Sequence, residues 1–204
     1  MTRGSRFPEA VPCHLRALEL CMQRRWWSEA MSLLVSCIDR LTWLWLPRHH
    51  ATLEPRLQRA WLARYLIEPG FDACDLEGLM DLIDRARPAG PRPSAQDVPC
   101  AMVVFEPASA VSVRESLDCA GLQQVALVPF GTLASAVARA AVAFVEDARR
   151  DSAGWSAVCD RAGHFADADA SLQRFVAAVE AGQGRRGGRV PWAPGLDTDS
   201  RPRR

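Results

Sequence analysis

The chain has 204 residues, of which 49% are hydrophobic and 24% charged, a composition typical of a globular protein with one domain or two small ones. Its 25 basic and 24 acidic residues leave a formal net charge of +1, which excludes a strongly basic nucleic-acid coat protein and an acidic solvating tail. Every one of the 25 is arginine, and the chain contains no asparagine. We attribute this skew to a GC-rich genome, so arginine content alone does not indicate phosphate recognition.

No segment has the pattern of a signal peptide or a membrane span. The most apolar stretch, residues 31–46, contains Asp39 and Arg40 and is too short to cross a bilayer. The seven cysteines are odd in number, lie at least eight residues apart and form no CxxC motif. We therefore expect a cytoplasmic protein with reduced, mostly buried thiols and no association with a membrane.

Four helices are predicted in the first half of the chain, where apolar residues recur at helical spacing. The second is the clearest, because Ser28 can cap its start, its apolar residues follow an i, i+3, i+4, i+7 pattern and Pro47 ends it. Apolar residues on its other face as well indicate a central helix that is buried nearly all round. The four helices are expected at about 13–25 (after Pro12), 28–45, 55–68 (from Pro55) and 76–87 (behind Asp75).

The pattern then changes to short, Val-rich segments. Residues 100–105 and 124–128 predict strands, because they are brief, apolar and flanked by prolines. A short helix at 111–120 lies between them, and such a helical crossover favours a parallel strand pair.

Three further helices follow, and the chain ends in a polar segment. The helices are expected at 132–150 (with Thr132 as cap), 152–162 and 167–181. The sequence therefore predicts a mainly α fold, a helical bundle of about six to seven helices with a minor two-stranded β element and a disordered C-terminal tail. We expect one domain, residues 1–182, followed by a flexible Arg/Gly/Pro-rich tail, residues 183–204.

The start of the tail matches a phosphate-binding motif in letters only. Residues 182–187 read GQGRRG, but a GxGxxG loop needs a strand before it and a helix after it, and here a helix precedes it. The tail carries six arginines against two aspartates, a local charge of +4. Arg185, Arg186 and Arg189 are candidate anion contacts of a flexible arm, although a solvated tail that aids solubility is the favoured interpretation.

Residues with catalytic or metal-binding chemistry form no recognisable set. His49 and His50 are adjacent in a loop and have no third ligand at a motif spacing, and His164 lies between helices. Cys13 and His14 are neighbours on a helix, where their side chains point about 100° apart, and no GxSxG motif occurs. We predict no catalytic residue, no metal and no cofactor. Most of the tryptophans lie at core spacing, which favours packing over base stacking.

Several segments, in order along the chain, resemble a bacterial branch of the HEPN superfamily of helical domains. The resemblance covers roughly residues 10–180, and the order of the segments is more specific than any single segment. The segments are RRWWSEAMSLLVSCIDRL at 24–41, WLARYLIEP at 61–69, DLEG at 75–78, MVVF at 102–105 and VALV at 125–128 before the helix at 132–149.

The resemblance implies a specific test for activity. Active HEPN proteins are metal-independent ribonucleases, often toxins or defence effectors that dimerise. Their motif is an arginine and a histidine on one helix, separated by four to six residues. Arginine can hold the scissile phosphate and histidine can transfer a proton near neutral pH. Here none of the four histidines follows an arginine at that spacing, and the motif would fall at Met80 and Arg85. Arginine cannot transfer a proton at neutral pH.

The sequence therefore predicts a HEPN-like helical protein with a degenerate active site, which acts by binding protein or RNA, as a homodimer, in a bacterial toxin–antitoxin or defence system. Arg85 and Arg87 are further candidate anion contacts. Two alternatives stay open: a divergent metal-independent ribonuclease, and an unrelated helical interaction scaffold.

Overall fold

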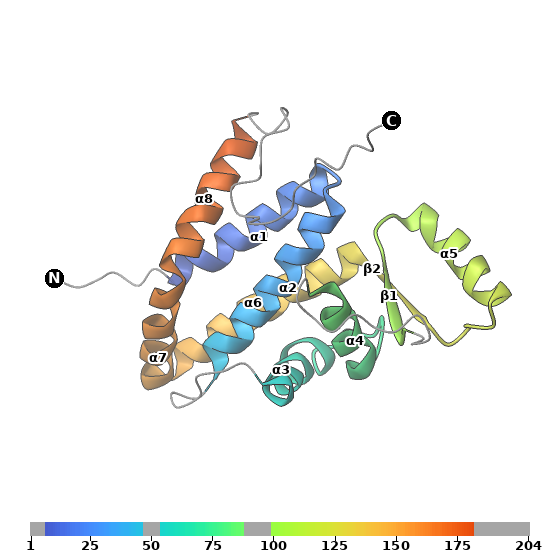
Figure 1. The fold of residues 1–204 in the computed structure, drawn as a ribbon. Helices are drawn as coiled ribbons and strands as arrows, with labels where there is room; N and C mark the ends of the chain where they lie inside the picture. The colour runs from blue at the N-terminus through green and yellow to red at the C-terminus, as the bar shows by residue number, and fades with distance from the viewer. Residues whose placement is uncertain (1–6, 47–53, 88–98, 182–204) are drawn as a thin grey trace.

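Helix α2 (Trp27–Trp45) lies at the centre of the fold, and five other helices pack on it. The computed structural model describes residues 7–46, 54–87 and 99–181 (Figure 1). From Cys37 to Leu46 no residue of this segment is exposed, as its two apolar faces predict. The other helices are α1 (Phe7–Gln23), α3 (Pro55–Leu62), α4 (Leu76–Ala86), α5 (Pro107–Cys119), α6 (Phe130–Arg150), α7 (Ser152–Ala162) and α8 (Ala166–Glu180).

The mainly α fold and the parallel strand pair are confirmed. Strands β1 (Ala101–Val104) and β2 (Ala126–Pro129) pair in parallel, with Ala101 opposite Ala126, and α5 makes the crossover. Together residues 101–129 form what we call the βαβ lobe, which lies beside the bundle at the right of Figure 1. Val104, Leu117 and Val125 are buried in the lobe but fall outside the main core cluster. The lobe therefore has a small core of its own.

The start of α1 differs from the prediction. The helix begins at Phe7 rather than near Cys13, and Pro12 lies inside it. Proline removes one helical hydrogen bond, but Val11 is 8% exposed and belongs to the core. Burial of Val11 outweighs the local preference of proline for a helix start.

Aromatic packing, and not a hydroxyl cap, marks the starts of α2 and α6. Ser28 and Thr132 are not the N-cap residues. The N-cap of α2 is Trp26 and that of α6 is Pro129, and neither makes a side-chain capping hydrogen bond. Trp27 stacks on Phe105 with 5.4 Å between ring centroids, and Phe130 lies 5.4 Å from Phe105. This cluster joins the starts of α2 and α6 to the end of β1 and thereby positions the βαβ lobe.

Two aspartates cap helices as good N-cap residues do. Helix α4 begins behind Asp75, as predicted, and Asp75 accepts a 2.7 Å hydrogen bond from the Gly78 amide. Asp151 accepts bonds from the amides of Ala153 and Gly154 at the start of α7, a cap that the sequence reading missed.

The third predicted helix changes its form before it ends. After α3 the chain continues as a π-helix, η1 (Ala63–Ile67), in which the amide of Glu68 donates to the carbonyl of Ala63. A second irregular turn, η2 (Gly163–Phe165), joins α7 to α8. The expected tail, residues 183–204, lies outside the described residues. None of the helices in the described ranges is both long and apolar enough to cross a membrane.

Candidate functional site

The two positions of the expected HEPN-type motif have structural roles. Met80 is 7% exposed and belongs to the main core. The Arg85 Nε donates a 2.7 Å hydrogen bond to Asp81, four residues earlier on α4. The other oxygen of Asp81 accepts the Cys100 amide at 2.9 Å, just before β1. Arg85 therefore supports a carboxylate that joins α4 to the βαβ lobe.

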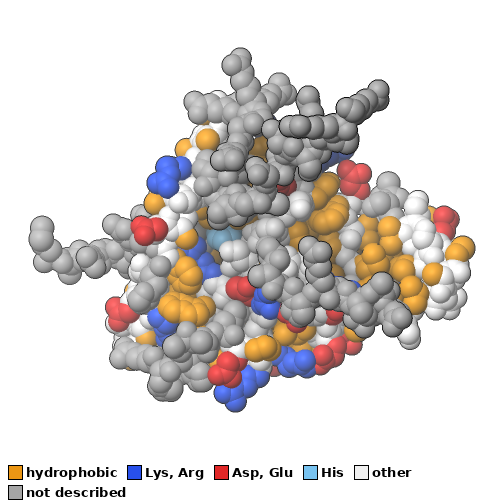
Figure 2. All heavy atoms as spheres, in the orientation of Figure 1, with side chains coloured by type: hydrophobic (Ala, Val, Ile, Leu, Met, Phe, Trp, Pro, Cys, Tyr) orange, Lys and Arg blue, Asp and Glu red, His pale blue; other side chains and the backbone are white. Residues whose placement is uncertain are grey.

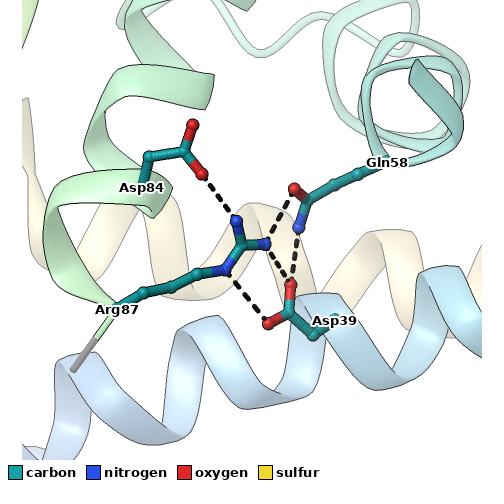
Figure 3. Close-up of polar contacts among 4 residues, drawn as sticks. All are labelled: Asp39, Gln58, Asp84 and Arg87. Atoms are coloured by element: carbon teal, nitrogen blue, oxygen red, sulfur yellow. Dashed lines mark hydrogen bonds and ion pairs between the residues drawn. The ribbon is translucent and has the colours of Figure 1, made fainter. Parts of the chain in front are cut away.

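Arg87, at the end of α4, is the centre of a polar cluster formed by three helices (Figure 3). Its Nη2 donates to Asp39 of α2 at 2.6 Å and to Gln58 of α3 at 2.9 Å, and its Nη1 donates to Asp84 at 2.6 Å. The Gln58 amide donates to the same Asp39 carboxylate at 2.6 Å. Gln58 is 1% exposed, so the amide is held in one position between the two charges.

The charge of this cluster opposes the binding of an anion. One guanidinium faces two carboxylates, Asp39 and Asp84, which leaves a formal charge of −1. Burial lowers the pKa of Arg87, but the hydrogen bond and charge of Asp39, with the charge of Asp84, raise it by more. The guanidinium therefore stays charged and occupied, and a phosphate at Arg87 would have to displace a carboxylate.

A buried ion pair fixes the last helix, and the sequence reading did not include it. Arg40 of α2 is 8% exposed and pairs with Asp169 of α8, and its guanidinium lies 4.4 Å from the centre of the Phe165 ring. At the other end of α8, Arg16 of α1 contacts Glu180 at 2.9 Å. These contacts bind α8 to α1 and α2, which brings together residues more than 120 positions apart in sequence.

His14 is unsuited to proton transfer near neutral pH. It is 5% exposed, and its Nε2 lies 2.9 Å from the Leu33 carbonyl, to which it must donate. Burial lowers the pKa of His14 to about 4; the hydrogen bond to Leu33 opposes this shift and the charge of Arg40 adds to it. His49 and His50 lie outside the described residues, and His164 falls in η2 with its side chain undescribed.

The buried cysteines are also weak candidates for chemistry. Burial is the main cause that raises the pKa of Cys21 and Cys37 to about 12 and that of Cys74 to about 11. A thiol is a nucleophile only as its thiolate, so these groups are unreactive at neutral pH. All seven cysteines lie in the described part of the chain, and no disulfide joins any of them.

A hollow of about 490 Å3 lies between the end of α2, η1, α6 and α7. Trp45, Tyr65 and Phe144 supply aromatic walls. Polar groups also converge there: Asp147 of α6 accepts from Arg64 at 3.0 Å and from the Tyr65 hydroxyl at 3.3 Å. Arg64 and Asp147 are 83 residues apart, and no sequence motif links them, so sequence reasoning missed this site.

A metal site is not found in the part of the chain that the structure describes. In the described ranges no group of three or more His, Cys, Asp or Glu side chains is arranged to hold a metal ion. The tail candidates Arg185, Arg186 and Arg189 lie outside those ranges.

No family model, no curated protein and no solved structure matches the chain.

The buried state of His14 predicts that the protein loses stability in acid. Between neutral pH and pH 4 the unfolded chain takes up a proton at an ordinary histidine pKa of 6.5, whereas the folded protein takes it up only near pH 4. Relative to His14→Gln, the free energy of unfolding of the parent protein should fall by about 3 kcal/mol over this range. Urea denaturation of both proteins at several pH values measures this difference. Parallel pH profiles would contradict the prediction.

Proposed function

We propose that this is a non-catalytic, HEPN-like helical protein that acts by binding a protein partner, in the cytoplasm and within a bacterial toxin–antitoxin or defence system. The observation that carries the proposal is at α4, where Met80 is part of the core and Arg85 is paired with Asp81. The proton-transfer group of a HEPN-type ribonuclease has no counterpart there. The family and the biological setting rest on the ordered sequence resemblance.

The distribution of charge favours a protein partner over RNA. Phosphate contacts dominate the affinity of nucleic-acid binding and need accessible cations. Pairing with a carboxylate reduces the positive potential around most of the arginines that the structure describes. The paired arginines are Arg16, Arg25, Arg40, Arg56, Arg59, Arg64, Arg85, Arg87 and Arg150.

The βαβ lobe is the surface that we assign to binding, and a second copy of the chain is the partner that we propose for it. Figure 2 shows hydrophobic side chains gathered over the strand pair and the adjacent side of α5. Met102, Phe105 and Leu127 are only half-buried, and Val111 of α5 is 63% exposed. Exposed apolar groups on a lobe with its own small core are typical of an interaction surface.

The absence of catalysis is testable with RNA in EDTA. End-labelled tRNA and a structured RNA, incubated with purified protein, should show no discrete cleavage on a denaturing gel, because the motif positions offer no proton-transfer group. The Arg85→Ala variant should give the same gel. Discrete cleavage by the parent protein that Arg85→Ala abolishes would establish a divergent ribonuclease instead.

The proposed interface predicts which surface valine matters for self-association. Val111→Asp should weaken the dimer at least tenfold, because it buries a charge in the interface, as measured by analytical ultracentrifugation. Val142→Asp is the matched control: Val142 is 56% exposed on α6, outside the lobe, and its replacement should leave association unchanged. A monomeric parent protein, or equal effects of both changes, would contradict the assignment.

A further inference from the structure

The hollow between α2, η1, α6 and α7 has the size and wall chemistry of a small-molecule site. Its volume of about 490 Å3 lies within the range of typical ligand pockets, about 300–1,000 Å3. Leu44, Trp45, Phe144 and Val158 line it with apolar surface, and Tyr65 adds an amphipathic ring. This combination suits a ligand with a flat apolar body.

The π-helix at η1 builds one wall of this hollow. Its residues span Ala63–Ile67, and both Arg64 and Tyr65 line the hollow. A π-turn holds an extra residue at a cost in backbone geometry, and such turns occur frequently at functional sites. Here the wide turn directs two consecutive polar side chains toward Asp147 of α6.

The charged groups of the hollow differ in how many hydrogen bonds they already make. Asp147 already accepts three hydrogen bonds, since one oxygen accepts from Arg64 and Tyr65 and the other accepts from Arg150 at 2.9 Å. Both oxygens of Asp151 are also used, since they cap α7. Arg64 by contrast has five N–H donors, and it gives only some of them, to Asp147 and to Tyr65. Every carboxylate oxygen already accepts at least one hydrogen bond, while the half-exposed guanidinium of Arg64 retains donors, so the site favours an acceptor with negative charge.

We propose that this hollow binds a small organic anion with a flat apolar body and one carboxylate or sulfonate group. Arg64 binds the anionic group, and the apolar body lies against Trp45, Tyr65 and Phe144. Asp147 holds Arg64 and Tyr65 in place through its hydrogen bonds to both. This site is separate from the βαβ lobe and from the cluster around Arg87, so it stands independently of the proposed function.

A pair of fluorescent probes tests the proposal on the full chain. Anilinonaphthalene sulfonate has the proposed body and charge, and N-phenylnaphthylamine has a similar body without the charge. The parent protein should bind the sulfonate saturably and more tightly than the neutral probe. Arg64→Gln should raise the Kd for the sulfonate about tenfold and remove the preference between the probes. Arg59→Gln, which changes a paired arginine of α3 outside the hollow, should do neither.

A second pair of variants locates the bound probe without changing any charge. Ala153 is exposed on α7 and lines the hollow, so Ala153→Trp should fill it and abolish saturable binding. Ser156→Trp, on an exposed position of the same helix outside the lining, should bind as the parent protein does. Far-UV circular dichroism confirms that the variants fold. No saturable binding, equal affinity for the two probes, or binding that survives both Arg64→Gln and Ala153→Trp would overturn the proposal.

Discussion

The rest of the structure depends on the burial of α2, which carries two adjacent opposite charges near its centre. Arg40 is 8% exposed and Asp39 is half-buried, and a charge that is withdrawn from water in this way needs a partner of opposite charge. Successive helical residues point in different directions, so the two side chains cannot share one partner. Asp39 is paired with Arg87 of α4, and Arg40 with Asp169 of α8. The central helix thus determines where two other helices are fixed.

This constraint also bears on function. Arg87 is a candidate for phosphate binding from its position alone, yet its guanidinium compensates Asp39 and Asp84. Arg85 is engaged in the same way by Asp81. Charges that stabilise the fold are then poorly suited to attract RNA, whereas the βαβ lobe and the hollow beside η1 are built mainly from apolar walls. Binding is proposed on these two regions, where Arg64 is the one paired arginine that we assign to a ligand, and the clusters around Arg85 and Arg87 keep a structural role.

Periodicity and turn residues were sufficient to predict the helices, the parallel strand pair and the start of α4 behind Asp75, because these depend on local sequence. The start of α1 at Phe7 and the aromatic contact of Trp27 with Phe105 were not predictable, because both depend on packing between distant segments. Asp39 and Arg40 are a visible signal that the central helix needs charged partners. The sequence does not say which partners, since Arg87 and Asp169 are 48 and 129 residues away. The π-helix and the hollow have no local signal at all.

A double-mutant cycle between Asp39 and Arg87 tests the central claim most directly. The free energies of unfolding of Asp39→Asn, Arg87→Gln, the double variant and the parent protein give the coupling between the two side chains. If the partial burial of Asp39 on α2 forces this pairing, the coupling should be about 1 kcal/mol or more, above the few tenths of a kcal/mol typical of an exposed ion pair. A coupling near zero, with additive effects of the two substitutions, would contradict the account.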